Sequence, residues 1–141
     1  MRRSFVSLTF AIILMPIAAS AATIEVEITG LVSDSGDVHI ALYDNPAAFP
    51  KPDGMLKETQ VLIHQRQART AFEGLPPGRY AIAVYHDENS NDDFDQGIFG
   101  IPLEDYGFSN NARVFFAPPS FEDAAFEVAE PLQRIRIRLN D

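Results

Sequence analysis

The chain has 141 residues, of which 20 are acidic and 11 are lysine or arginine, and its formal net charge at pH 7 is −9. Such an acidic chain is poorly suited to nucleic acids or anionic membrane surfaces as partners and is better suited to cations. The absence of cysteine excludes disulfides and thiol chemistry.

The first predicted element is a secretory signal peptide over residues 1–21. Two arginines precede an apolar run from Phe5 to Ala18, and small residues at 19–21 provide a cleavage site before Ala22. An uncleaved anchor is the alternative, but the run is short for a membrane span. We therefore expect a secreted or periplasmic protein in which residues 22–141 form a single domain without a membrane span.

Strand signals recur along the rest of the chain, and helix signals are nearly absent. Apolar and polar residues alternate in segments bounded by turn residues, which is typical of strands with one buried face. The predicted strands are TIEVEI (23–28), DVHIALY (37–43), TQVLIHQ (59–65), RTAFEGL (69–75), RYAIAVYHD (79–87), ARVFF (112–116), AAFEVA (124–129) and LQRIRIRL (132–139). Two long connections interrupt them, at residues 44–57 and 87–111. This pattern predicts an all-β fold, an antiparallel β-sandwich of about seven or eight strands, immunoglobulin-like or transthyretin-like.

The segment FEGLPPGRYAIAV, residues 72–84, predicts a turn that leads into a central strand. Tyr80, Ile82 and Val84 alternate along that strand and should form its buried face. The F-x-x-L-P-x-G-x-Y pattern resembles a corner of transthyretin-like and carboxypeptidase-regulatory-like β-sandwich modules. This resemblance implies a fold and carries no chemistry.

An acidic stretch, HDENSNDDFDQG, follows this strand at residues 86–97. Alternate residues of a tightly curling loop point toward a common centre, so oxygen donors at positions 1, 3, 5, 7 and 9 can converge on one ion. The residues at these positions are Asp87, Asn89, Asn91, Asp93 (through its carbonyl) and Asp95. Because all the donors are oxygens, the predicted ligand is Ca²⁺.

Two positions depart from the D-x-D-x-D-G-x-x-D calcium pattern. Position 6, where the loop turns sharply, is Asp92 instead of glycine, and position 12 is Ile98 instead of glutamate. Glu104 or Asp105 is the nearest acid that would supply a further oxygen. We therefore expect a weak calcium site, and repulsion among the carboxylates favours a cation. The alternative is a solvated loop whose aspartates and asparagines make turns.

Three arginines, Arg134, Arg136 and Arg138, lie on one face of the last predicted strand. We expect them to be solvated and to pair across strands with acids such as Glu25 and Glu27. An anion-binding ladder is the alternative for this row.

The combined pattern resembles a secreted bacterial family catalogued as domain of unknown function 2141. The resemblance rests on the H-D-x-N-x-N-x-x-x-D run at 86–95, on F-G-x-P at 99–102, on G-F-S-N-N at 107–111 and on SFEDAAFEV at 120–128. Family members usually carry glycine where Asp92 stands in this chain. The resemblance implies no activity, because the family is named for lacking one.

These observations support two hypotheses from different functional classes. The first is a secreted, non-enzymatic β-sandwich module with a structural calcium loop, which binds an unknown protein or glycan partner through its loop end. The second is a small periplasmic metal-assisted enzyme that uses the acidic loop and His86. Two weaker arrangements are a zinc site of His39, His64 and His86 and a hydrolytic triad of His86, Asp87 and Ser109. No nucleophile motif accompanies the triad.

Overall fold

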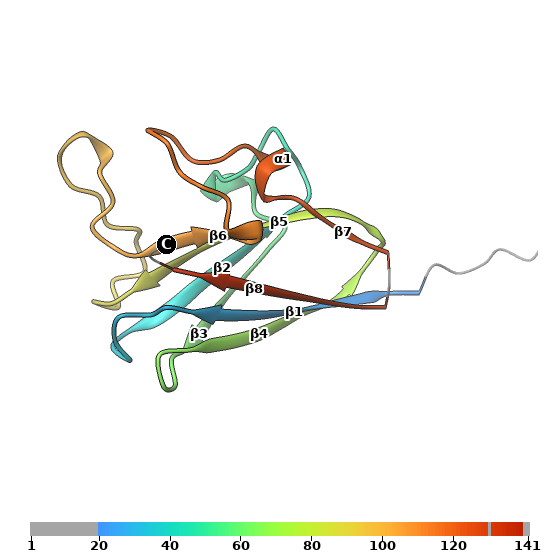
Figure 1. Cartoon of the computed structure of the whole chain (residues 1–141), viewed down its shortest axis with the longest axis horizontal. Helices are drawn as coiled ribbons and strands as arrows, with labels where there is room; N and C mark the ends of the chain where they lie inside the picture. Colours follow the sequence, from blue (N-terminus) through green and yellow to red (C-terminus); the bar gives the residue numbers. More distant parts are fainter. Residues whose placement is uncertain (1–19, 130, 140–141) are drawn as a thin grey trace, which may run out of the picture.

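The structure is a computed structural model, and it describes residues 20–129 and 131–139 (Figure 1). The predicted signal peptide, residues 1–21, lies almost entirely outside these described residues and stays a prediction. The described residues contain eight strands, one α-helix of four residues and three short 3-10 turns. No helix in this part of the chain is long and apolar enough to cross a membrane.

The strands form two sheets. The first has the order β4-β1-β8, with the bounds Ala68–Leu75, Ala22–Thr29 and Leu132–Arg138. The second has the order β3-β2-β5-β6, and β7 also pairs with β5. Its strands are β3 (Lys57–Leu62), β2 (Asp37–Tyr43), β5 (Gly78–Asp87), β6 (Tyr106–Phe108) and β7 (Phe126–Val128). Neighbouring strands pair antiparallel, except β1 with β8, which are parallel. The predicted all-β fold is therefore confirmed, with one parallel pair inside a largely antiparallel arrangement.

The remaining elements are short. The 3-10 turns span Pro52–Gly54, Ile98–Gly100 and Ser109–Asn111, and α1 spans Phe121–Ala124. Ser120 caps α1, because its hydroxyl accepts a hydrogen bond from the Asp123 N–H while the Asp123 carboxylate accepts one from the Ser120 N–H. Such a reciprocal cap explains how a single helical turn forms in a chain with few helix signals.

Two local predictions differ from the structure. Residues 112–116, predicted as a strand, are irregular apart from an isolated bridge between Phe115 and Ala117. Phe115 and Phe116 are 72% and 111% exposed, so no buried face fixes a strand there. Conversely, β6 lies within residues 87–111, where we expected only a connection.

One apolar core lies between the two sheets. Tyr80, Ile82 and Val84 of β5 are 3%, 0% and 3% exposed and belong to it, which confirms the predicted buried face of that strand. Burial of an aliphatic side chain of this size contributes about 1.5–3 kcal/mol to folding. The other strands contribute alternate residues in the same way: Ile24, Val26 and Ile28 of β1, Val38, Ile40 and Leu42 of β2, and Ile137 of β8.

The opposite face of the second sheet is covered as well, so residues 38–43 of β2 are all buried. Phe49, from the connection after β2, packs edge-on against Tyr43, Phe108 and Phe121 with ring centroids 5.1, 5.8 and 5.9 Å away. Figure 1 shows α1 and the neighbouring loops on this side, away from β1 and β4. Toward the start of β2 and the end of β5, polar side chains join the aromatic residues on this face, and the candidate site lies there.

Candidate functional site

The acidic loop begins at Asp87, the last residue of β5, which is 0% exposed. Its Oδ1 accepts a hydrogen bond from the Asn91 backbone N–H at 3.1 Å, and its Oδ2 accepts one from the Asp92 N–H at 2.8 Å. A buried carboxylate needs such donors, because burial without them strongly disfavours its charged form. Asp87 therefore holds the loop back over the end of its own strand.

Two asparagines continue this curl. The Asn91 N–H also donates to Asn89 Oδ1 at 3.1 Å, and the Asp93 N–H donates to Asn91 Oδ1 at 3.0 Å. The side-chain amides of Asn89 and Asn91 donate to the two oxygens of Asp95, at 2.6 and 3.0 Å. The structure thus joins four of the predicted ligands, Asp87 included, in one network. Asp93 enters it through its backbone N–H, and its side chain is exposed.

Asp92 occupies the sharp turn at which glycine was expected. Its φ of +61° lies in the left-handed region, which costs most residues about 1–2 kcal/mol and aspartate less than most. Its Oδ1 accepts a hydrogen bond from Gln60 Nε2 at 2.7 Å, which holds the loop against β3. The departure from glycine at this position therefore leaves the curl of the loop intact.

Glu104 is the acid that the structure adds to the loop. Its Oε2 accepts a hydrogen bond from the Asp95 N–H at 3.0 Å, whereas its Oε1 is buried and accepts no well-formed hydrogen bond among the described residues. Burial raises the pKa of Glu104; the backbone N–H groups of Asp95 and, more weakly, Glu88 oppose the increase, and the charges of Asp87 and Asp95 add to it. A cation would stabilise such a carboxylate, because one of its oxygens is buried without a hydrogen bond and other carboxylates lie nearby.

The fit of the loop to calcium is mixed. The carboxylates of Asp87, Asp95 and Glu104 are hard oxygen donors of the kind that Ca²⁺ prefers. The amides of Asn89 and Asn91, however, direct N–H groups toward Asp95. Both amides would have to rotate before their oxygens faced an ion beside Asp95.

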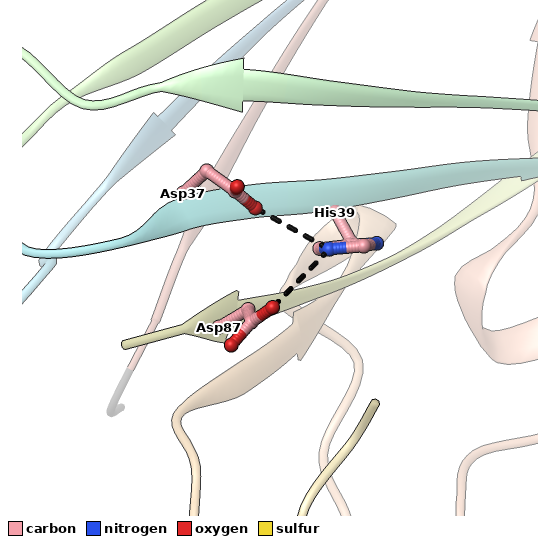
Figure 2. A group of neighbouring side chains, drawn as sticks. All are labelled: Asp37, His39 and Asp87. Carbon is pink, nitrogen blue, oxygen red and sulfur yellow. Dashed lines mark ion pairs between the residues drawn. The ribbon is translucent and has the colours of Figure 1, made fainter. Parts of the chain in front are cut away.

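A second cluster, which the sequence did not suggest, adjoins the loop through Asp87. His39 of β2 is 4% exposed, and its ring stacks on Tyr85 of β5 with centroids 4.5 Å apart. Its Nε2 lies 3.3 Å from Asp37 Oδ1 and 3.6 Å from Asp87 Oδ2. Figure 2 shows the two carboxylates on either side of this nitrogen. Its Nδ1 lies 3.3 Å from Glu58 Oε1, at hydrogen-bond distance.

Strand pairing explains why these residues meet. Asp37 and His39 are two residues apart on β2 and therefore share a face of the sheet. The antiparallel register places Asp37 opposite Asp87 and His39 opposite Tyr85. The D-x-H spacing in the sequence could have indicated that Asp37 and His39 share a face. No pattern of neighbouring residues indicates that Asp87 lies opposite them.

The alternatives that use other histidines are not assembled. His86 lies on the other face of β5 from Asp87, and its Nε2 is 2.7 Å from the Ser35 carbonyl oxygen. Ser109 is 0% exposed; its hydroxyl donates to the Ala124 carbonyl at 2.5 Å and accepts from the Ile82 N–H at 2.9 Å. These bonds do not connect histidine, aspartate and serine as a triad requires.

The three-histidine zinc site is not assembled either. His64 is exposed in the hairpin between β3 and β4, where its backbone forms a bridge with Gln67. His39 and His86 lie on opposite faces of the second sheet, since β2 and β5 pair with His39 opposite Tyr85 and Val38 opposite His86. No single ion can contact all three rings.

Two arginines of the β8 row form the expected cross-strand pairs with Glu25 and Glu27. Arg134 Nε lies 2.9 Å from a Glu25 oxygen, and Arg136 Nε lies 2.5 Å from a Glu27 oxygen. Arg69 of β4 approaches the other oxygen of Glu27 at 2.6 Å. Because these guanidinium groups already face carboxylates, the anion-binding alternative has little support.

Comparisons with known proteins give a family and no function. A family model described as "Uncharacterized protein conserved in bacteria (DUF2141)" matches residues 26–136. This range includes β2, β5, the acidic loop and Glu104, and so contains the whole candidate site. No curated protein and no solved structure matches the chain significantly.

Proposed function

This chain belongs to the bacterial family of uncharacterized proteins DUF2141, and we propose that it is a secreted or periplasmic, non-enzymatic β-sandwich module whose acidic loop binds one structural calcium ion. The observation that carries the calcium proposal is the buried Oε1 of Glu104, an acceptor without a donor beside a loop of carboxylates. The proposal of export rests on the signal-like residues 1–21.

Calcium suits this loop because every candidate ligand is an oxygen and the ligands come from a curled loop that can adjust its geometry. Burial and the neighbouring charges of Asp87 and Asp95 raise the pKa of Glu104; the ion would offset both effects and would give Oε1 a partner. It would also fix the loop to the end of β5. The proposed ligands are Asp87, Asn89, Asn91, the Asp93 carbonyl, Asp95 and Glu104.

The enzymatic alternative has less support. It assigns chemistry to His86, but His86 is only 1% exposed, and its Nε2 is at hydrogen-bond distance from the Ser35 carbonyl in the turn before β2. Ser109 likewise ties α1 to β5 through its hydroxyl. Both residues are better explained as supports of the fold.

The segment after the acidic loop carries side chains suited to a partner. Ile98, Phe99, Ile101 and Leu103 are between 62% and 97% exposed. Neighbouring exposed apolar side chains often mark an interaction surface. In Figure 1 this loop, drawn in gold, extends beyond the strands. We propose that it contacts a protein or glycan, and that calcium orders the adjoining residues for that contact.

The test is a calorimetric titration of the purified protein with Ca²⁺, combined with thermal unfolding in chelator and in rising Ca²⁺. We expect a dissociation constant of about 10⁻⁴–10⁻³ M, as in extracellular modules. At one hundred times that constant, binding to the native state alone would add about 2.7 kcal/mol to the free energy of unfolding. Mg²⁺ should raise the melting temperature less, because it requires a tighter octahedron and dehydrates reluctantly.

Matched variants distinguish calcium binding by this loop from a general effect of the protein's negative charge. Asp95→Asn and Glu104→Gln should abolish the response to Ca²⁺, since each removes one charged oxygen donor. Glu73→Gln removes the same charge from an exposed position on β4 and should leave the response intact. A melting temperature that stays constant from chelator to about 10 mM Ca²⁺ would contradict the calcium proposal.

A further inference from the structure

We propose that Asp37, His39 and Asp87 form a second metal site, which binds Zn²⁺ or a similar divalent ion of the first transition row. The three potential ligand atoms lie within 4.8 Å of one another, and Figure 2 shows Asp37 and Asp87 flanking one ring nitrogen of His39. This inference does not require calcium in the neighbouring loop, although the two sites share Asp87.

The distances from His39 Nε2 to the carboxylate oxygens are close to those expected between ligands of a tetrahedral ion. With metal–ligand bonds of about 2.0–2.1 Å, two ligand atoms at tetrahedral positions lie about 3.3 Å apart. His39 Nε2 is 3.3 Å from Asp37 Oδ1 and 3.6 Å from Asp87 Oδ2. Oδ1 of Asp92 lies 3.7 Å from the same nitrogen and offers a fourth donor.

Hydrogen bonds fix the tautomer of His39 that a metal site needs. Gln60 Nε2 donates to Asp92 Oδ1 at 2.7 Å, which identifies this end of the Gln60 side chain as its NH₂ group. The same NH₂ group is 3.0 Å from His39 Nε2, so Nε2 is the acceptor and the ring proton lies on Nδ1. Nδ1 then donates to Glu58 Oε1, at 3.3 Å. A metal-binding histidine typically donates its second nitrogen to a carboxylate in this way.

Asp37 gives an independent indication of a cation. Its Oδ1 is buried and has no hydrogen-bond donor among the described residues. It lies 3.3 Å from His39 Nε2, and two acceptors at that distance repel each other unless a proton or a metal ion lies between them. The Asp37 side chain as a whole is 20% exposed, which gives an ion a path from solvent.

The ligand set selects the class of metal. Imidazole nitrogen suits zinc and its neighbours in the first transition row, whereas calcium prefers oxygen alone. Asp37, His39 and Asp87 stand on paired strands, so their positions are set by the sheet and not by a loop. An ion at this site would replace the Gln60 amide at His39 Nε2, and Gln60 would keep its bond to Asp92.

The test is titration of the chelator-treated purified protein with Zn²⁺ by calorimetry and with Co²⁺ by visible absorption, since tetrahedral Co²⁺ gives a strong band. We expect one equivalent to bind. His39→Gln should abolish the binding and the band, whereas His64→Gln, which changes an exposed histidine, should leave both unchanged. Glu58→Gln keeps all three ligands and should weaken binding about 10- to 100-fold, as loss of a supporting carboxylate does.

Two outcomes would overturn the proposal: failure of the parent protein to bind Zn²⁺ or Co²⁺, or unchanged binding by His39→Gln. Circular dichroism in chelator would verify that each variant is folded. The calcium loop is tested separately in the same series. Asp95→Asn and Glu104→Gln should lose Ca²⁺ and keep Zn²⁺, whereas His39→Gln should keep Ca²⁺, so each site can fail without the other.

Discussion

Asp87 is the residue on which both candidate sites depend. Its carboxylate bonds the acidic loop through both oxygens, and Oδ2 also faces His39. The backbone of Asp87 is equally constrained, because Gly36 of the turn before β2 packs directly on its carbonyl. A Cβ added to Gly36 would lie 1.8 Å from the Asp87 carbonyl oxygen. The position of this carboxylate is therefore set by backbone packing from a segment distant in sequence.

We expect Gly36→Ala to be strongly destabilising. Gly36 has a φ of +69°, so alanine suffers the left-handed penalty of about 1–2 kcal/mol and the collision with Asp87 in addition. Gly74→Ala is the matched control, because Gly74 has a φ of +71° and nothing within 4 Å of the added Cβ. Urea unfolding in chelator should show the larger loss for Gly36→Ala. Equal losses would mean that the close packing on Asp87 contributes nothing.

At the scale of the elements, β2 and β5 carry two different faces. Ile40, Ile82 and Val84 face the core between the sheets. His39 and Tyr85 lie on the opposite face of the second sheet, where the candidate sites are. Because successive side chains of a strand alternate, a shift of one residue in register would exchange the two faces. The buried inner face therefore fixes the register, and the register in turn places Asp37 opposite Asp87.

Val84→Asp tests the assignment of the inner face. Val84 is 3% exposed, and the variant would place a charge without a partner in the core, at a cost of several kcal/mol. Val32→Asp makes the same chemical change at a residue that is 52% exposed and should cost little. Thermal unfolding of both variants gives the comparison. If Val84→Asp melted at the temperature of the parent, the assignment of Val84 to the buried face of β5 would be wrong.

The first sheet contributes a pH-dependent term through Glu27. Hydrogen bonds from Arg69 and Arg136 lower the pKa of Glu27 below its ordinary value. A carboxyl whose pKa is lowered by folding stabilises the fold above its unfolded pKa, and this contribution is lost as the pH falls through the lowered pKa.

Glu27→Gln should therefore flatten the acid side of the stability profile, by a small amount because the arginines are exposed. Urea midpoints between about pH 2 and pH 5 measure the effect. Glu73→Gln, at an exposed position on β4 outside this network, should preserve the slope of the parent. A parental slope in Glu27→Gln would show that these ion pairs add nothing to stability.

Among the described residues, the ion pairs of the first sheet and the carboxylates of the candidate sites lie in different parts of the molecule. Arginines on β4 and β8 pair with glutamates of β1, whereas the carboxylates of the candidate sites gather at one end of the second sheet. With a net charge of −9, the negative potential at that end should raise the local concentration of cations. These carboxylates are Asp37, Asp87, Asp92, Asp95 and Glu104.

Export is a property of the whole chain and has a direct test. Protein recovered from its host should begin at Ala22 or Thr23, because residues 19–21 have the small side chains of a signal cleavage site. Intact mass spectrometry measures this directly. A mass that includes residues 1–21 would contradict the prediction of a cleaved signal.

The sequence by itself determined the features that depend on neighbours along the chain. Alternation identified the buried face of β5, because the period of a strand is local. The spacing of Asp87, Asn89, Asn91 and Asp95 predicted one curled loop, and they do share a hydrogen-bond network. The strand predicted at residues 112–116 was wrong, because this segment has no sustained alternation of apolar and polar residues and its phenylalanines are exposed.

Only the tertiary structure decided which distant residues complete the candidate sites. Glu104 was one of two nearby acids in the sequence, and the fold placed its carboxylate on the Asp95 N–H. His39 and Asp37 reach Asp87 because β2 pairs with β5 in one register. That register follows from burial of the inner faces of both strands, which is a property of the assembled core. A pairing between residues about 50 positions apart has no local period, so the sequence alone could not reveal it.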